Sequence, residues 1–226
     1  MRVDLNADLG EEVTDDAALL ELVTSANVAC GYHAGTPVVM RAVCAEAARL
    51  GVAVGAQVSY ADREHFGRVA RDVPAGLLAD QVADQVGTLT DIAVSEGSAV
   101  TYLKPHGALY HRVRDDAEQA AAVLAGSGHL PVLGQPGRLL EQAAAAGRAT
   151  YLEGFADRTY RGDRLVPRDE PGALIEGDEA IAAQAVALAD RVESVCVHGD
   201  SPGAVGAARA VRRALEAAGY VLAAPW

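Results

Sequence analysis

Residues that commonly transfer protons or bind polar ligands recur at the ends of short apolar runs in this chain. Asp4, Asn6 and Asp8 occupy alternate positions, so their side chains share one face if this segment is an extended strand. Carboxylates grouped in this way act as general bases or hold cations. The same residues would also cap or solvate the end of a strand, and the spacing fits both interpretations.

A lysine and a histidine flank a proline later in the chain, at Lys104 and His106. Of the 19 basic residues, Lys104 is the only lysine and all others are arginine. An ammonium kept where a guanidinium serves elsewhere indicates a task that needs a compact cation, such as stabilising charge on an oxygen. The alternative is a surface amine in an exposed turn.

Three further segments carry residues of catalytic type directly after apolar runs. These residues are His33 in one segment, Glu153, Asp157 and Arg158 in the next, and His198 and Asp200 in the last. Structural alternatives exist here too, because His33 would bond the backbone of its turn and Asp200 would cap a helix. The other histidines lie among charged residues, and we expect them to be solvent-exposed: His65, His111 and His129.

Short β-branched runs alternate with amphipathic stretches along the whole chain, which is typical of an α/β fold with parallel strands. The runs predict seven strands, at residues 2–5, 26–30, 52–56, 99–104, 130–133, 149–153 and 194–198. The amphipathic stretches predict helices near 15–24, 37–50, 75–95, 115–125, 136–146, 178–191 and 203–218. Thr14, Pro37 and Pro202 mark predicted helix starts, and Gly51 marks an end. Periodicity alone leaves a closed barrel and an open sheet as alternatives.

The candidate residues lie at or just past the predicted strand ends. In a parallel barrel or sheet the carboxyl ends of the strands meet at one edge, where active sites are built. We therefore expect one cluster. Two long turn-rich loops, 59–73 and 157–173, are expected to contribute to it, because loops of this length in a compact domain are usually functional.

Length and composition restrict the class of protein. A chain of 226 residues is expected to form one domain. We expect no Lys/Arg cluster anywhere in the chain, and this expectation, with the net charge of −12, argues against nucleic acid or an anionic membrane surface as partner. The start of the chain lacks a secretory pattern, and no apolar run is long enough to span a bilayer. Three cysteines without a CxxC pair favour buried, reduced thiols, and we expect a cytoplasmic protein.

Five motifs, DLNADLGE, ANVACGYHAG, YLKPHGALY, EGFADRTY and VHGDSPGAV, together resemble the LamB/YcsF family. The resemblance extends from residue 3 to about residue 218. It implies a single-domain parallel (βα)7 barrel, TIM-barrel-like and related to the glycoside hydrolase/deacetylase superfamily. It also implies the A subunit of an ATP-dependent 5-oxoprolinase, which hydrolyses 5-oxo-L-proline to L-glutamate with B and C subunits and with Mg²⁺ as counter-ion of ATP. A homo-oligomer is left open.

Roles follow from the chemistry that the resemblance implies. Lys104 would supply the cation near the transferred group, and the candidates for activating water are Asp8, His106 and Asp200. Arg158 would hold the substrate carboxylate bidentately. We place the remaining candidates in substrate binding: Asn6, His33, Glu153, Asp157 and His198. The chain has no Walker loop, so whether ATP binds this chain or a partner stays open.

The sequence departs from the family pattern at two motif positions and in length. Thr36 stands where the family usually has aspartate, and Gln57 where it usually has histidine. The usual insertion before the last predicted strand is missing. Because glutamine is a poor ligand for borderline cations, we assign no metal ligands. Two alternatives remain: a metal-dependent deacetylase or amidohydrolase that uses Asp4, His33 and His198 without ATP, and a non-catalytic lactam-binding subunit.

Overall fold

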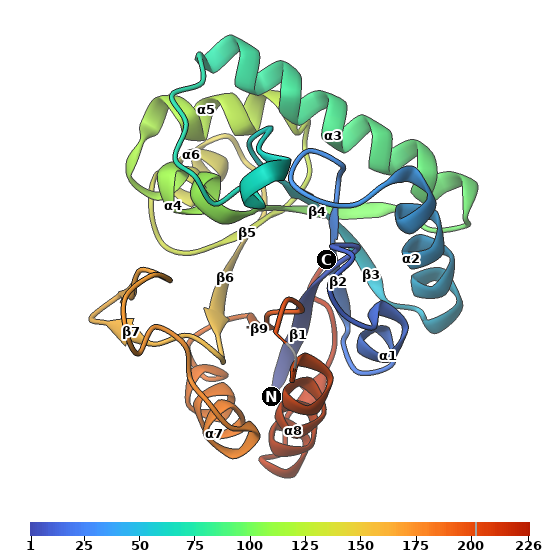
Figure 1. The fold of residues 1–226 in the computed structure, drawn as a ribbon, viewed down its shortest axis with the longest axis vertical. Coiled ribbons are helices and arrows are strands. Elements are labelled where there is room, and N and C mark those ends of the chain that lie inside the picture. The colour runs from blue at the N-terminus through green and yellow to red at the C-terminus, as the bar shows by residue number, and fades with distance from the viewer. Residues whose placement is uncertain (202) are drawn as a thin grey trace.

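The computed structural model describes residues 1–201 and 203–226, and parallel strands form a closed barrel at its centre (Figure 1). Within the described residues the barrel has seven strands, in the order β1 (Arg2–Leu9), β2 (Ser25–Ala29), β3 (Ala53–Val58), β4 (Val100–Pro105), β5 (Val132–Gly134), β6 (Thr150–Phe155) and β9 (Ser194–Val197). The barrel closes because β9 also pairs with β1, where Cys196 lies opposite Asn6. The predicted seven-stranded parallel barrel is confirmed.

Helices surround the barrel on its outside (Figure 1). The predicted ones are present as α1 (Asp16–Leu20), α2 (Pro37–Leu50), α3 (Ala75–Ser95), α5 (Ala117–Gly126), α6 (Arg138–Ala145), α7 (Asp178–Leu188) and α8 (Ala204–Ala217). One helix, α4 (Gly107–Asp115), was not predicted. It begins directly after β4 and is separated from α5 by Asp116 alone, so its pattern merges with that of α5. In the described part of the chain, no helix has the length and apolar character to cross a membrane.

Two predicted helix starts can be compared with the caps in the structure. Thr14 does not cap α1; the carboxylate of Asp15 accepts the hydrogen bond from the backbone N–H of Ala18, while the Thr14 hydroxyl binds the carbonyl of Gly199. The prediction for α2 is confirmed, because Pro37 is its first residue and Thr36 caps it. Thr36 thus provides the capping oxygen that an aspartate would provide. Pro202 lies outside the described residues.

Short elements extend the barrel and its loops. β10 (Val221–Leu222) pairs in parallel with the start of β1. The loop at 157–173 contains an antiparallel hairpin, β7 (Tyr160–Arg161) and β8 (Arg164–Leu165), and the loop at 59–73 contains a 3₁₀ turn at Arg63–His65. Neither the hairpin nor β10 was predicted, because strands of two residues leave no periodic signal in the sequence.

The alternation in β1 sorts its side chains onto two buried faces. Val3, Leu5, Ala7 and Leu9 belong to the hydrophobic core between barrel and helices. The residues between them point into the barrel, where their partners are Ser25, Asn27 and Ser194 on the neighbouring strands. Outward apolar burial therefore stabilises the barrel, while its interior carries a polar network.

Aromatic side chains fill the interior at the level below Lys104. The Tyr102 hydroxyl donates to the side-chain oxygen of Asn27 at 2.6 Å, and the Trp226 ring stacks on the Tyr102 ring at 3.7 Å. Gly55 faces the Tyr102 ring, and a Cβ built there would lie 2.2 Å from it. The absence of a side chain at Gly55 thus makes room for the ring.

Candidate active site

A cavity of about 1010 Å³ lies at the carboxyl ends of the barrel strands. Five of the predicted site residues line it: Asp8, Lys104, His106, Arg158 and His198. They come from the ends of β1, β4, β6 and β9 and the segments that follow, so the topology brings together residues almost 200 positions apart. Both long loops contribute to the wall as well, through Arg68 in one and residues 158–169 in the other.

Lys104 lies inside the barrel at the floor of this cavity. Its Nζ is 3.0 Å from Asp8 Oδ1, 2.7 Å from Glu153 Oε1 and 3.3 Å from Asn6 Oδ1. The alternative of a surface amine in an exposed turn is wrong, because the residue is 2% exposed. Burial opposes its charge, but Asp8, Cys196 and Glu153 together raise the pKa of Lys104 well above its usual value. An ammonium is therefore held at the floor.

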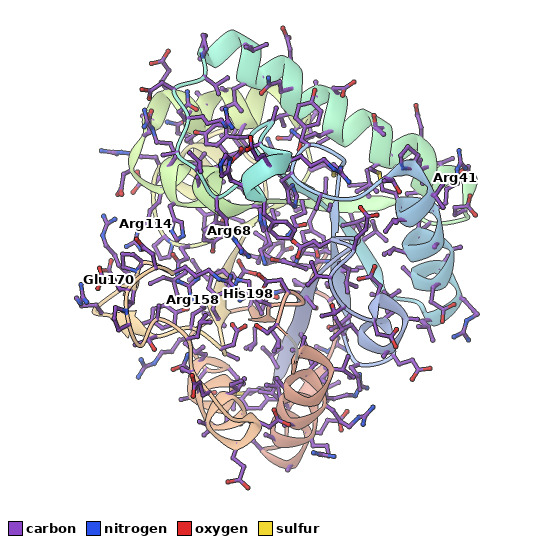
Figure 2. All side chains as sticks on the ribbon, in the orientation of Figure 1. Arg41, Arg68, Arg114, Arg158, Glu170 and His198 are labelled. Atoms are coloured by element: carbon purple, nitrogen blue, oxygen red, sulfur yellow. The ribbon has the colours of Figure 1, made fainter. Side chains whose placement is uncertain are left out.

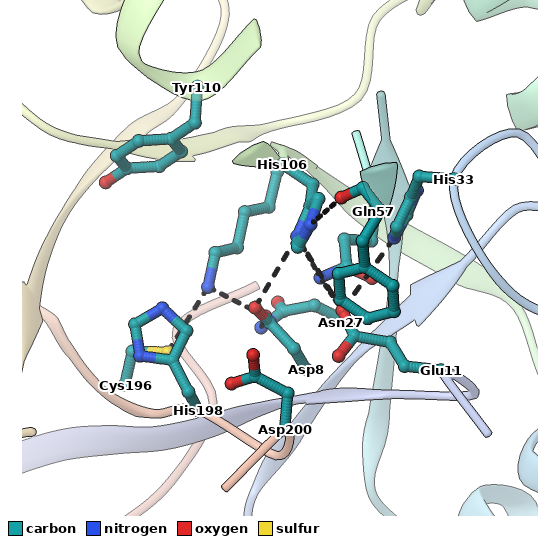
Figure 3. A network of polar contacts seen from close by, with 12 residues as sticks. Asp8, Glu11, Asn27, His33, Gln57, His106, Tyr110, Cys196, His198 and Asp200 are labelled. Carbon is teal, nitrogen blue, oxygen red and sulfur yellow. Dashed lines mark hydrogen bonds and ion pairs between the residues drawn. The ribbon is translucent and has the colours of Figure 1, made fainter. Parts of the chain in front are cut away.

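Asp8 lines the cavity and forms an ion pair with Lys104. Figure 3 shows Asp8 beneath His106. Its Oδ1 also accepts a hydrogen bond from Asn27 Nδ2 at 2.9 Å, and its Oδ2 lies 3.8 Å from His106 Nδ1. Burial alone would raise the pKa of Asp8, but the charge of Lys104 holds it well below the usual range. Asp8 is ionised at neutral pH and oriented by two donors.

His198, which lines the cavity wall, pairs with the buried carboxylate of Asp157. The two carboxylate oxygens of Asp157 lie 2.8 and 3.0 Å from His198 Nδ1, and one accepts the backbone N–H of His198 at 3.1 Å. This arrangement fixes Nδ1 as the donor and leaves Nε2 for a ligand, as when a buried carboxylate orients a catalytic histidine. Burial lowers the pKa of His198, but Asp157 outweighs it, with Asp8 adding to and Arg168 opposing the net upward shift.

The His198–Asp157 pair predicts a pH dependence. Because the folded pKa of His198 is raised, the stability from its charge is present below about pH 6.5, the ordinary histidine value, and is lost as pH rises through the folded pKa. Asp157→Asn should therefore lower the His198 pKa, measured by NMR titration of the imidazole C–H signals. The exposed His129 is the internal control, and an unchanged His198 pKa would contradict the assignment.

A buried cluster lies behind His106, where Glu11, His33 and Gln57 meet it (Figure 3). The His33 and His106 rings stack with centroids 4.1 Å apart. The Gln57 Nε2 lies 3.0 Å from both Glu11 Oε1 and His106 Nδ1. Burial raises the pKa of Glu11 to about 7 and lowers that of His33 to about 4. Gln57 is thus at the centre of the cluster.

Phe66, from the 59–73 loop, covers both imidazoles of this cluster. Its ring meets the His33 and His106 rings edge-on, at 5.7 and 5.5 Å between centroids. Its backbone is left-handed, with φ 58°, which is uncommon for a non-glycine residue. Its carbonyl lies 3.2 Å from His106 Nε2 and accepts the hydrogen bond that this N–H donates. The loop therefore fixes the orientation of His106.

Arginines surround the mouth of the cavity (Figure 2). The lining has seven basic and three acidic side chains, a formal charge of +4 with histidines neutral, in a chain whose net charge is −12. Besides Lys104, the basic residues are Arg68, Arg114, Arg158, Arg161, Arg164 and Arg168. The expectation that the chain has no basic cluster is wrong. Four of these arginines lie inside the 157–173 loop, in the 11-residue stretch 158–168.

Two of the predicted residues hold these loops in place. Arg158 donates from Nε to the carbonyl of Ala173 at 3.3 Å and from Nη2 to that of Val166 at 2.6 Å, so one edge of its guanidinium binds its own loop. Asp200 accepts hydrogen bonds from Arg168, at 2.9 Å to each oxygen, and from Arg68. Asp200 therefore connects the two long loops, and it is not the cap of α8.

Other predicted residues lie behind the cavity wall and not in it. Asn6 and Glu153 are buried beneath Lys104, where Glu153 Oε2 accepts the Tyr110 hydroxyl at 3.0 Å. His33 lies behind His106, and Asp157 behind His198. The histidines expected to be exposed, His65, His111 and His129, are exposed.

The metal ligands of the deacetylase alternative do not come together. Asp4 accepts hydrogen bonds from the hydroxyls of Thr24 and Ser25, and His198 is bound to Asp157. In the described residues, the group with metal-ligand geometry is Glu11, His33 and His106. Glu11 was not among the predicted residues, although it ends the DLNADLGE motif. The cationic mouth was not predicted either, although the four arginines of the 157–173 loop were a visible signal.

The model of the LamB/YcsF family matches residues 3–225. The chain belongs to the LamB/YcsF family. A relative from Streptomyces avermitilis, named as the A subunit of 5-oxoprolinase, is 51% identical over an alignment of 247 residues that covers 98% of this chain and 99% of the relative. A relative of the same name from Mycobacterium leprae is 49% identical and covers 96% of each chain. The first alignment exceeds the 226 residues of this LamB/YcsF chain, so that relative has residues that this chain lacks.

Two solved structures have a fold similar to that of this LamB/YcsF protein. The lactam utilization protein from Thermus thermophilus is 34% identical, with a TM-score of 0.92 over 99% of this chain and 100% of that one. A family 4 carbohydrate esterase from Streptomyces lividans is 13% identical, with a TM-score of 0.54 over 98% of this chain and 91% of that one. The second likeness shows a shared fold.

Proposed function

We propose that this chain is the A subunit of an ATP-dependent 5-oxoprolinase, which hydrolyses 5-oxo-L-proline to L-glutamate. The observation that carries the proposal is a cation-lined cavity with the Lys104–Asp8 pair at its floor, in a chain of strongly acidic composition. The substrate carboxylate and a transferred phosphoryl group are both anions, which this mouth would attract. The names of relatives about 50% identical over the whole chain support the same activity.

The arginine mouth suits ligands that exchange. Arg161 is 2.8 Å from Glu170, and Arg164 is 2.8 Å from Asp115, in pairs that are largely exposed. Exposed pairs contribute about 1 kcal/mol or less, so a phosphate group can replace the carboxylate at low cost. Hydrogen bonds engage Nε and Nη2 of Arg158 with its own loop. Arg158 would therefore hold the substrate carboxylate through its remaining N–H groups, two on Nη1 and one on Nη2, which still allow a bidentate pair.

The lactam amide is resonance-stabilised, so its oxygen must be activated before the ring opens. Transfer of the γ-phosphoryl group of ATP to that oxygen activates the ring carbon, and Lys104 stabilises the negative charge. Water, oriented by Asp8, adds to this carbon; the ring C–N bond then breaks and His198 protonates the nitrogen. The product is γ-glutamyl phosphate, and a second water releases phosphate to leave glutamate. Mg²⁺ would accompany the nucleotide as its counter-ion.

Activity is expected only when this chain is combined with its B and C partners. The chain has no Walker loop, and a phosphoryl transfer needs both reacting groups held about 3–3.5 Å apart. The measurement is ADP release that depends on 5-oxoproline, made on this chain alone, on the partners alone and on the mixture. We expect turnover in the mixture and none above background in either part.

Three other outcomes of these measurements would contradict the proposed function in different ways. Full activity from this chain alone would overturn its place in a multi-subunit enzyme and favour a self-sufficient amidohydrolase. A mixture that binds 5-oxoproline, measured by calorimetry, yet releases neither ADP nor glutamate would favour the non-catalytic lactam-binding role. A mixture that neither binds nor turns over 5-oxoproline would contradict the substrate and direct attention to Gln57.

A further inference from the structure

The cluster of Glu11, His33 and His106 has no role in the reaction above, and its geometry is that of a metal site. One ligand atom from each residue lies within 4.8 Å of the others. Glu11 Oε1 is 3.7 Å from His33 Nε2 and 3.6 Å from His106 Nδ1. Tetrahedral zinc with bonds of about 2.0–2.1 Å needs ligand atoms about 3.4 Å apart. The two distances from Glu11 are within a few tenths of an ångström of this spacing, and the stacked His33 and His106 rings would tilt apart to direct both lone pairs at one ion.

Buried polar atoms in this cluster lack partners. His33 is 1% exposed, and within the described residues neither of its ring nitrogens makes a hydrogen bond. The same holds for Oε1 of Gln57. A buried polar group without a partner typically costs about 1–3 kcal/mol. A cation bound to His33 Nε2 would remove part of that cost, whereas the protein residues around the ring do not.

The tautomer of His106 is already the one that a metal ligand requires. Its Nε2 donates to the carbonyl of Phe66 at 3.2 Å, so Nδ1 carries the lone pair that faces Glu11 and Gln57. Metal-binding histidines almost always donate their other N–H to a carbonyl or carboxylate in this way. The left-handed backbone at Phe66 forms part of the turn that positions this carbonyl.

Gln57 occupies the remaining side of the cluster. Its amide nitrogen lies 3.0 Å from Glu11 Oε1 and 3.0 Å from His106 Nδ1. Rotating the amide by 180° exchanges nitrogen and oxygen, which would direct Oε1 at the same point in space. The rotated amide oxygen would then be about as far from Glu11 and His106 as ligands of one ion are from each other.

We propose that Glu11, His33 and His106 bind one divalent cation of the zinc type, with the Gln57 amide oxygen completing the protein ligands. Two imidazoles and one carboxylate are a ligand set typical of zinc sites, and imidazole disfavours Mg²⁺ and Ca²⁺. His106 and the neighbouring Asp8 line the cavity, so the ion lies beside its floor. The site does not depend on the proposed function, because binding is measurable without turnover.

The test uses the full chain, freed of metal by chelation, and Zn²⁺ alone as the ligand. Calorimetry is expected to give one ion per chain, Co²⁺ is expected to give the visible absorption of a tetrahedral site, and Zn²⁺ should raise the melting temperature. Glu11→Gln and His33→Ala should each weaken Zn²⁺ binding by more than about 100-fold, since even second-shell changes cost 10- to 100-fold. His129→Gln removes an exposed imidazole and should bind as the wild type does.

A variant that adds a ligand tests the same site in the opposite direction. Gln57→His supplies a third imidazole and should tighten Zn²⁺ binding by about tenfold or more. The isosteric Glu11→Gln, with circular dichroism to show that it folds, separates loss of a ligand from loss of structure. The proposal is overturned if the wild type binds no Zn²⁺, if Glu11→Gln binds it as tightly as the wild type, or if Gln57→His binds no tighter.

Discussion

Replacing Lys104 by methionine is expected to lower the free energy of unfolding by about 3–5 kcal/mol and to abolish turnover. The methionine side chain fits the space but leaves Asp8 and Glu153 as buried carboxylates whose cation, 3.0 and 2.7 Å away, is gone. Removing one partner of a buried ion pair typically costs this much, because the remaining charge stays out of water. The same change removes the ammonium from the cavity floor, so both readouts should fall together.

Urea unfolding measures the stability change, and two further variants isolate its cause. Adding Glu153→Gln to Lys104→Met removes one of the uncompensated charges and should recover part of the lost stability. Lys104→Arg keeps the charge but adds volume at a fully buried position, which typically costs about 1–3 kcal/mol, and we expect it to lose most of the activity. A loss below about 1 kcal/mol for Lys104→Met would show that the carboxylates find other partners.

The fold was predictable because local signals and topology agree. In β1 the apolar and polar residues alternate, the apolar ones packing on helices and the others facing inward, which a strand with two distinct faces requires. The rest of the barrel follows from alternation of strands and helices. Helix α4 was not predicted, because only His106 separates its first residue, Gly107, from the end of β4, and only Asp116 separates it from α5.

The site was predictable in its location but not in its contacts. The lone lysine and the strand-end positions indicated where the cavity would form. The burial of Lys104 was not visible, because it depends on Asp8, which is 96 positions away, and on Glu153 from another strand. Glu11 lies beyond Gly10, whose φ of 74° turns the chain out of β1. The alternation of side chains along the strand therefore predicted inward-facing residues only as far as Asp8.

Asp8→Asn is expected to reduce kcat of the assembled enzyme by about 10²- to 10⁴-fold, the usual contribution of a positioned acid or base. The amide oxygen can still accept from Lys104 and from Asn27, as Asp8 Oδ1 does at 3.0 and 2.9 Å, so the local geometry survives. Glu153 still neutralises Lys104, so folding should be retained. What disappears is the negative charge that orients and activates water.

The control for Asp8→Asn is the same substitution at a carboxylate on the protein surface. Asp91→Asn makes the same chemical change on the exposed face of α3 and should leave kcat and KM unchanged. For Asp8→Asn, kcat should fall far more than KM rises, because the carboxylate acts on water in the transition state and the arginine mouth still binds substrate. A kcat within tenfold of the wild type would exclude Asp8 as the group that activates water. The role would then pass to His198, whose orientation by Asp157 does not involve the Asp8 charge directly.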